Sequence, residues 1–284
     1  MKLGICSDYL VKLGTREGSK LIHSHGFSYL DYSEFSNTEA DFFKLPEKEF
    51  EKYLLEQRKI MESEGIFISQ THGPWRYPPR DLEPGDRAER FASMSKAIRG
   101  TAYLGAKNFV IHPLMPFGAY SSENPEKMWE INLEFMARLA HVGEENGITV
   151  CYENMPFYSS PITTPHHVLE MAKQIGSKYF KICLDTGHAL ICGVSPADAV
   201  REIGKEYLAC LHVHDNNGKN DLHDIPLTGV LDWKDFMASL NEIGYDGVFS
   251  LENGLPPIDE NKMHEELEKN LFDIEDSIKR LSNL

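Results

Sequence analysis

The segment Pro125–Asn154, PEKMWEINLEFMARLAHVGEENGITVCYEN, contains the unit from which the chain is built. Residues Pro125–Asn146 have the period of an amphipathic helix, with apolar side chains returning every three or four positions. Gly147 can adopt the left-handed backbone that ends a helix and returns the chain to a sheet. The apolar run Ile148–Tyr152 then predicts a buried strand, which stops at Glu153-Asn154. The segment therefore predicts a helix, a glycine turn, a strand and a polar strand end.

The same unit recurs along the chain. Short apolar runs predict strands at Leu3–Cys6, Phe27–Tyr32, Ile66–Gln70, Asn108–Ile111, Ile148–Tyr152, Phe180–Leu184, Leu208–Val213 and Val248–Leu251. Helical segments lie between them, including Lys48–Glu64, Ala88–Leu104, Pro165–Ile175 and Trp233–Ile243. The strands are continuously apolar, as parallel strands covered on both faces are. Eight alternations in 284 residues predict an α/β protein with one (β/α)8 TIM barrel domain spanning residues 1–284.

The alternative fold is a doubly wound open sheet. Proteins of that class that bind nucleotides carry a glycine-rich phosphate loop after the first strand. Here Cys6-Ser7-Asp8-Tyr9 stands in that place, which favours the barrel. The amphipathic tail His264–Leu284 is expected to close the barrel rather than bind a partner.

Composition narrows the classes of partner. The net charge is −15, from 44 acidic and 29 basic residues, and this opposes a broad surface for nucleic acid. No apolar run is long enough to span a membrane, and the start, MKLGICSDYL, turns polar too early for a signal peptide. Five cysteines without close pairing indicate a reduced, cytoplasmic protein. We expect the partner to be a small molecule rather than a nucleic acid or a membrane. The composition does not decide whether the protein forms an oligomer.

Polar residues gather at one end of the predicted strands. In a barrel the catalytic groups lie at the C-terminal strand ends. A single His or Asp there is more often a helix cap or a buried core group than a ligand, but here six consecutive strands end in such residues. They are Thr71-His72-Gly73, His112-Pro113, Glu153-Asn154, Asp185-Thr186-Gly187-His188, His212-Val213-His214-Asp215 and Glu252-Asn253.

Three of these carboxylates, Glu153, Asp185 and Glu252, would be costly to bury around one barrel mouth without a cation. Together with His212 they form a ligand set that suits Mn²⁺, Mg²⁺, Co²⁺ or Zn²⁺. His214 lies two residues after His212 and therefore shares its strand face.

The loop after these histidines is rich in glycine and asparagine and contains Asp221 and His223. On composition, this loop either folds over the mouth or is simply solvated. Asp215, directly before it, is expected to point away from the mouth.

These motifs carry a resemblance to a known family. THG, IHP, CYEN, CLDTGHA, HVHDNNGKNDLHDIPLTGVLDW and LEN resemble the xylose isomerase-like TIM barrel superfamily, which contains sugar phosphate isomerases and epimerases, inosose dehydratases and endonuclease IV. The resemblance runs from the third strand to the eighth. In the sugar branch it implies a divalent metal held by Glu153, Asp185, His212 and Glu252. His212 is preferred to His214 because the family's histidine precedes the acidic residue of its motif, here Asp215, by three positions.

The resemblance also implies a substrate site. His188 resembles the substrate-binding histidine of the family, and we place His72, His112, His214 and Trp75 in substrate binding as well. Phe117, Phe157 and Tyr9 are candidates for an apolar wall. Two positions depart from the ketose 3-epimerases: Ser159 replaces a glutamate and Gly218 replaces an arginine. The substrate is therefore not inherited from them.

The resulting expectation is a metal-dependent sugar isomerase or epimerase, with Mn²⁺ as the first candidate ion. Glu153 and Glu252 would exchange the α-proton of a ketose, polyol or sugar derivative through an enediolate. The alternatives are an endonuclease IV-like enzyme with three zinc ions, a keto-sugar lyase, dehydratase or deglycosidase, and a non-catalytic sugar-binding protein. The nine zinc ligands of endonuclease IV have counterparts in His72, His112, Glu153, Asp185, His188, His212, Asp221, His223 and Glu252.

Overall fold

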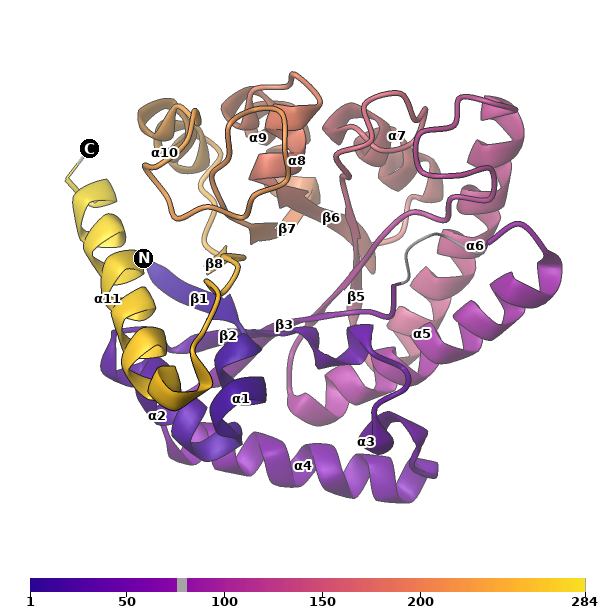
Figure 1. The fold of residues 1–284 in the computed structure, drawn as a ribbon. Coiled ribbons are helices and arrows are strands. Elements are labelled where there is room, and N and C mark those ends of the chain that lie inside the picture. The colour runs from indigo at the N-terminus through magenta and orange to yellow at the C-terminus, as the bar shows by residue number, and fades with distance from the viewer. Residues whose placement is uncertain (76–80, 284) are drawn as a thin grey trace.

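The computed structural model describes residues 1–75 and 81–283. Its strands form one parallel sheet in the order β7-β6-β5-β4-β3-β2-β1-β8. The strands are β1 (Lys2–Cys6), β2 (Tyr29–Tyr32), β3 (Phe67–His72), β4 (Asn108–Ile111), β5 (Thr149–Glu153), β6 (Phe180–Asp185), β7 (Leu208–His212) and β8 (Val248–Leu251). A bridge between Val213 and Leu251 joins the end of β7 to β8, with the Val213 amide donating to the Ser250 carbonyl at 2.9 Å. The sheet thus closes, and the predicted TIM barrel is confirmed (Figure 1).

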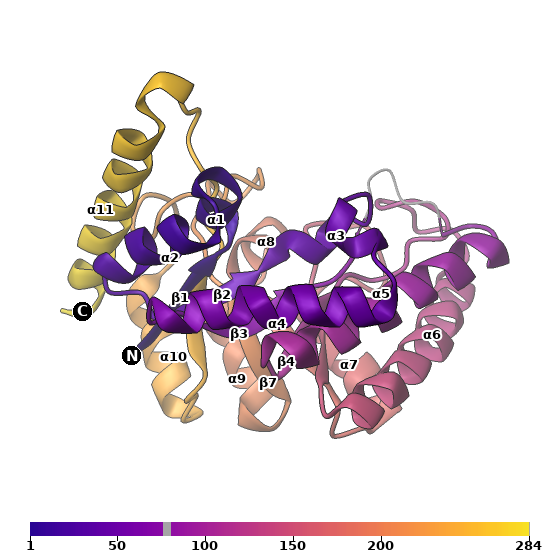
Figure 2. The same cartoon turned by 90° about the horizontal axis from the view of Figure 1, so that it is seen from below.

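Helices surround this ring of strands (Figures 1 and 2). They are α1 (Asp8–Leu13), α2 (Thr15–Ser24), α3 (Asp41–Lys44), α4 (Glu47–Ser63), α5 (Pro84–Leu104), α6 (Pro125–Asn146), α7 (Pro165–Ile175), α8 (Thr186–Ile191), α9 (Pro196–Tyr207), α10 (Trp233–Glu242) and α11 (Met263–Leu281). The predicted bounds of α6 and α7 are confirmed. Within the described ranges, no helix is both long and apolar enough to cross a membrane.

Three strands continue further than their apolar residues indicate. β3, β5 and β6 end at His72, Glu153 and Asp185, one or two residues beyond the predicted ends. Backbone pairing with the neighbouring strand extends β5 and β6, because Glu153 lies in register with Cys183, and Asp185 with His212. These polar side chains therefore stand on rigid strands rather than on loops.

The interior below the strand ends is filled by small thiols and one valine. Cys151, Cys183 and Cys210 are buried and free, and they lie two residues before Glu153, Asp185 and His212. Alternation along a strand places each thiol on the same face as its polar successor. A layer of buried apolar side chains therefore lies directly beneath the polar residues.

The C-terminal helix α11 packs beside α1 and α2, where the two ends of the barrel meet (Figures 1 and 2). It buries Leu267, Leu271 and Ile274, and the Tyr9 hydroxyl donates to the Asn270 side chain. This packing confirms the expected role of the tail in closing the barrel.

Candidate metal centre

Four side chains from neighbouring strands converge at the barrel mouth. Glu153 comes from β5, Asp185 from β6 and His212 from β7, and Glu252 directly follows β8. One ligand atom of each lies within 4.8 Å of the ligand atoms of the other three. We call these four residues the central group. It contains His212, whereas His214 belongs to another group of possible ligands, with His188, Asp221 and His223.

The second nitrogen of His212 is held by Asp31. Nε2 lies 2.7 Å from Oδ2 of Asp31, a carboxylate that accepts the N–H. The lone pair is therefore on Nδ1, which lies 3.0 Å from Oε1 of Glu153 and 3.2 Å from Oε2 of Glu252. A lone pair that faces two carboxylates at this distance requires a proton or a cation between them. A histidine held by a carboxylate on its far nitrogen is typical of metal ligands.

Asp31 is a residue that the sequence pattern did not single out. It stands buried on β2 and also accepts a hydrogen bond from Nε2 of Gln70 at 2.8 Å. The available signal was an acidic residue inside the apolar strand segment Tyr29–Tyr32, where an unpaired carboxylate would be costly.

The Asp31 contact leads to a prediction. Asp31→Asn keeps the shape but loses the charge that orients His212, so we expect metal affinity to fall about 10- to 100-fold. Competition with a fluorescent chelator measures this loss. Unchanged affinity would show that Asp31 does not support His212.

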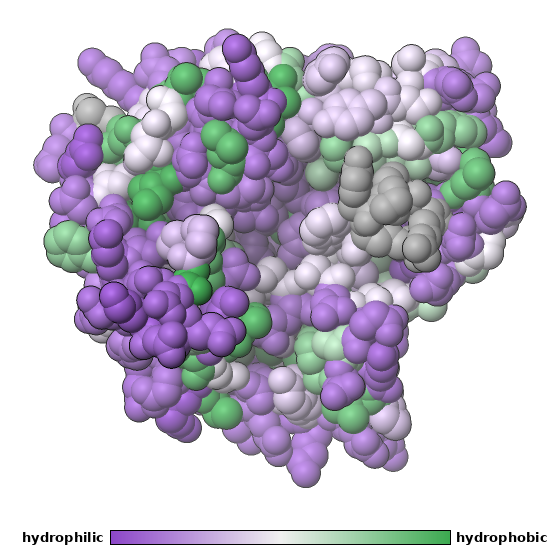
Figure 3. Space-filling model, in the orientation of Figure 1, coloured by the Kyte–Doolittle hydropathy of each residue, from purple (hydrophilic) through white to green (hydrophobic). Residues whose placement is uncertain are grey.

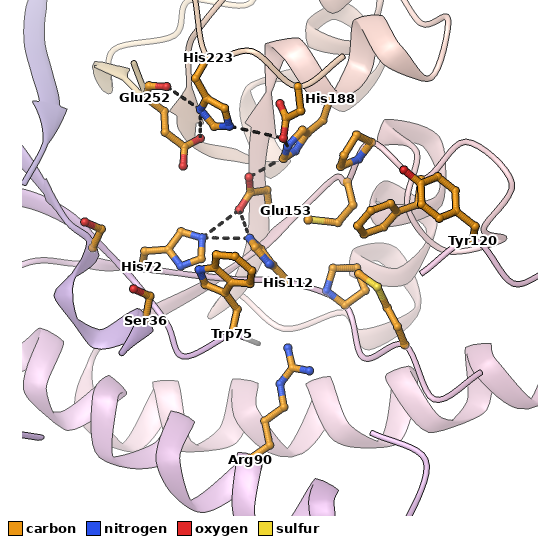
Figure 4. A pocket seen from close by; sticks show the side chains of 17 residues that line it. Ser36, His72, Trp75, Arg90, His112, Tyr120, Glu153, His188, His223 and Glu252 are labelled. Carbon is orange, nitrogen blue, oxygen red and sulfur yellow. Dashed lines mark hydrogen bonds and ion pairs between the residues drawn. The ribbon is translucent and has the colours of Figure 1, made fainter. Parts of the chain in front are cut away.

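A second cluster flanks the central group on one side. Nδ1 of His72 donates to the Gly73 carbonyl at 3.0 Å, which leaves the lone pair on Nε2. That nitrogen lies 3.0 Å from Nε2 of His112 and 3.4 Å from Oε2 of Glu153, and the nitrogen of His112 lies 3.2 Å from the same oxygen. His72 and His112 therefore face a predicted metal ligand, so they are candidate ligands as well as candidate substrate contacts (Figure 4).

A third cluster lies on the other side. Nδ1 of His188 donates to the Asn154 carbonyl and Nδ1 of His223 donates to the Glu252 carbonyl, each at 2.8 Å. Their Nε2 atoms lie 3.2 Å and 3.4 Å from Oδ2 of Asp221. The loop that carries Asp221 and His223 thus folds over the mouth (Figure 4).

His214 and Asp215 support the site from behind. The structure does not bring His214 to the cavity: its side chain is fully buried, and Nε2 lies 3.1 Å from both oxygens of Asp185. It also packs on Gly187, where an added Cβ would lie 2.0 Å from the ring. Asp215 turns away as expected and accepts hydrogen bonds from the Trp233 indole and the Gly229 amide. His214 therefore orients Asp185, and Asp215 anchors the loop that follows it.

The donor atoms fit a divalent cation. Oε2 of Glu153 and Oε2 of Glu252 are buried and accept no hydrogen bond from the described part of the chain. Carboxylate oxygens in that state are costly unless a cation binds them. Carbonyls and carboxylates orient the imidazole rings through their N–H groups, and the free lone pairs of these rings complete a mixed nitrogen and oxygen donor set. Such a set suits first-row divalent ions and Mg²⁺.

The two glutamates of the central group differ in acidity. Burial raises the pKa of Glu153, but His212 and His112 outweigh it and hold that pKa well below its usual range. Burial raises the pKa of Glu252, and His212 offsets this only in part. Glu153 is therefore the ionised partner and Glu252 the one that more readily holds a proton.

The mouth opens into a cavity of about 490 Å³. Figure 3 shows this face of the molecule hollowed near its centre, with hydrophilic residues at the bottom of the hollow. Trp75 and Phe157 line the cavity as predicted, whereas Tyr9 and Phe117 do not. The sequence pattern missed Ser33, Ser36, Arg90 and Tyr120, which also line it. The signal for Arg90 was an arginine at helical spacing from Met94 and Ala97 on the buried face of α5.

Comparison with known proteins identifies the family. The family described as "Xylose isomerase-like TIM barrel" matches residues 20–272. The chain belongs to this family. The D-psicose 3-epimerase of Ruminiclostridium cellulolyticum is 31% identical to this xylose isomerase-like barrel over 205 residues, which are 69% of the chain and 67% of that protein. The protein MJ1311 of Methanocaldococcus jannaschii is 33% identical over 213 residues, 71% of the chain and 68% of its own length. A solved D-tagatose 3-epimerase-like protein superposes with a TM-score of 0.74 at 27% identity, covering 98% of this chain and all of that one.

Ser159 and Gly218 are the two positions at which the sequence resemblance predicts departures from the ketose 3-epimerases. Ser159 donates from its hydroxyl to the Tyr120 carbonyl at 2.6 Å and so ties two loops of the cavity wall together. Gly218 has a φ of 72°, a backbone conformation that an arginine would adopt only with strain. Both departures are built into the local structure.

Proposed function

We propose that this protein is a divalent-metal-dependent sugar epimerase or isomerase that moves the proton on the carbon next to a ketose carbonyl. The observation that carries the proposal is the convergence of Glu153, at the end of β5, and Glu252, directly after β8, at the central group. Two carboxyl groups that reach one site from different strands suit a base and an acid. The likeness to sugar 3-epimerases supports the proposal.

The residues would divide the work as follows. Glu153, Asp185, His212 and Glu252 would hold a divalent cation, with Mn²⁺ as our first candidate, and the cation would supply Lewis-acid stabilisation of the negative charge that develops on the substrate oxygens. Glu153, ionised on β5, accepts the α-proton, and Glu252, beyond β8, donates a proton to the opposite face. His188, which lines the cavity, orients a substrate hydroxyl.

The direct test is exchange of the α-proton. The Mn²⁺-loaded protein is incubated in D₂O with D-fructose, D-psicose, D-tagatose and L-ribulose, and the products are followed by NMR and chromatography. We expect deuterium at the carbon next to the carbonyl of at least one sugar and of its epimer or aldose isomer. Elimination products in place of epimers would point to a lyase of the same scaffold. No exchange in any sugar, with metal bound, would contradict the proposal.

A second candidate function rests on the two flanking clusters. His72 and His112 face one oxygen of Glu153, and His188 and His223 face Asp221, so the mouth has donors for more than one ion. Multi-metal sites favour phosphoester cleavage, as in the endonuclease IV-like alternative. The net charge of −15 opposes binding of duplex DNA, and we rank this function second.

Metal analysis separates the two functions. For the epimerase we expect about one Mn, Mg or Co per purified chain, because the central group alone completes a four-ligand site. Mass spectrometry of the acid-digested protein gives this ratio. About three zinc ions per chain, together with nicking of duplex DNA that carries an abasic site, would reverse the ranking.

A further inference from the structure

The cavity extends well beyond the central group. Its volume of about 490 Å³ is in the range that holds drug-sized ligands, and a single monosaccharide is smaller than these. Figure 4 shows Glu252 and His223 at one end of the cavity and Tyr120 at the other, with Glu153 between them. A sugar whose reacting carbon lies between Glu153 and Glu252 therefore leaves the Tyr120 end unfilled.

That end is an aromatic wall made of Tyr120 and Phe157. Tyr120 is 54% exposed, which is high for a ring of this size. The rings of Tyr120 and Phe157 meet edge to face, with their centroids 5.1 Å apart. Phe157 in turn packs on the buried cluster of Met115, Ala119 and Met155. The wall is therefore held in place before any ligand binds, and exposed apolar surface inside a cavity marks a contact site.

The arginine of the described residues that lines the cavity is compensated within the protein. Arg90 lines the cavity, but its Nη1 lies 2.5 Å from Oδ2 of Asp81, and both side chains are buried. The Met115 amide also donates to this carboxylate oxygen, at 3.2 Å. The guanidinium charge is thus compensated within the protein, so a phosphate on the substrate would gain little from Arg90.

We propose that the substrate is a ketose carrying a second sugar ring, which stacks on the aromatic wall while the ketose unit lies at the central group. This assignment rests on the proposed function and names its substrate class. The C–H faces of a pyranose are apolar and flat, which matches rings held edge to face beside an open surface. The hydroxyl groups on the rim of the same ring stay in contact with water at the cavity opening.

Binding of unreactive analogues tests the second subsite independently of catalysis. Sorbitol and its 4-O-galactosyl and 6-O-glucosyl derivatives have adjacent hydroxyls but no carbonyl, so none of them can form an enediolate. The Mn²⁺-loaded protein is titrated with each by calorimetry. We expect one glycosyl derivative to bind at least about tenfold more tightly than sorbitol, since aromatic stacking of one ring is worth roughly that factor.

Variants at Tyr120 test whether the aromatic wall causes the tighter binding of the glycosyl derivative. Tyr120→Ala should lower the ratio of the affinity for the glycosyl derivative to the affinity for sorbitol about fivefold. Tyr120→Phe keeps the ring and should preserve this ratio. Tyr120 is more than half exposed, so the alanine variant removes little core packing. Equal binding of sorbitol and both derivatives to the wild type, or a ratio unaffected by Tyr120→Ala, would overturn the inference.

Turnover then separates the inference from the proposed function. The kcat/KM of the wild type is compared for D-fructose and for 6-O-glucosyl fructose and 4-O-galactosyl fructose, with the glycosyl ketose expected to be higher. Tight binding of a glycosyl polyol without turnover of any ketose would support the subsite and contradict the epimerase. Turnover of D-fructose with no preference in binding or in kcat/KM would support the epimerase and contradict the subsite.

Discussion

Glu153→Gln is expected to lower epimerase turnover at least about 1,000-fold while the protein remains folded, because the substitution removes a general base and a metal ligand together. Glutamine has the same shape but no charge, so it cannot accept the α-proton. The substitution also disturbs three imidazoles, since Oε1 of Glu153 faces His212 and Oε2 faces both His72 and His112. Single-turnover kinetics with saturating Mn²⁺ measure the loss, and far-ultraviolet circular dichroism verifies the fold.

Glu252→Gln provides the parallel experiment. It removes the proton donor, so turnover should fall about 100- to 10,000-fold, and epimerisation should suffer more than deuterium exchange of the substrate's own α-proton. Glu130→Gln on the outer face of α6 is the matched control, because Glu130 contacts only Lys127 on the surface among the described residues, and its variant should keep full turnover. Full activity in both Glu153→Gln and Glu252→Gln would refute the proton-relay assignment.

The geometry also explains why Glu153 has the largest expected effect. Its two oxygens connect the central group with the cluster of His72 and His112, so one side chain belongs to two sets of donors. It stands on β5 in register with β6, directly above the buried Cys151. A carboxylate fixed in this way does not reorganise when substrate binds, and such preorganisation is what lets a site stabilise charge at little cost.

Much of this site was predictable because barrel topology converts sequence order into position. Once the apolar runs are read as parallel strands, Glu153, Asp185 and His212 must meet at one end, however far apart they lie in the chain. Asp31 escaped this reasoning because its role depends on a contact across the barrel, from β2 to His212 on β7. The periodicity of a strand says which face a residue occupies but not which partner it meets there.

The cavity wall was less predictable for a similar reason. Trp75 and Phe157 follow strand ends and could be proposed from their positions, whereas Tyr120 lies in a loop whose path depends on tertiary contacts such as the Ser159 hydrogen bond. Arg90 comes from a helix, and only the packing of α5 against the barrel brings it to the cavity. Loops and helix faces thus contribute specificity that strand patterns do not encode.

Removal of the divalent ion by chelation should abolish turnover and lower the melting temperature by roughly 5–10 °C. A metal present about 100-fold above its Kd stabilises the folded state by about 2.7 kcal/mol. In a protein of this size each kcal/mol shifts the melting temperature by about 2–4 °C. The structural cause is the central group, where three carboxylates converge within 4.8 Å and depend on a cation for compensation. Differential scanning calorimetry with excess EDTA, and then after Mn²⁺ is restored, measures the shift.

The metal-free protein should also respond to pH in a defined direction. Burial lowers the pKa of His188, but Asp185 and Asp221 outweigh burial and raise this pKa to about 10. Burial also lowers the pKa of His223, but Asp221 and Glu252 outweigh burial and raise this pKa to about 10. A pKa raised above the unfolded value of about 6.5 stabilises the fold at low pH, and this stability is lost as pH rises from about 6.5 through 10. Burial also lowers the pKa of His212, but Glu252 and Glu153 outweigh it and raise that pKa well above its usual range. Protons and metal compete for Nδ1 of His212, so the difference in melting temperature between loaded and metal-free protein should widen from pH 6 to pH 9. A difference that narrows over this range would show that His212 does not bind the ion that stabilises the barrel.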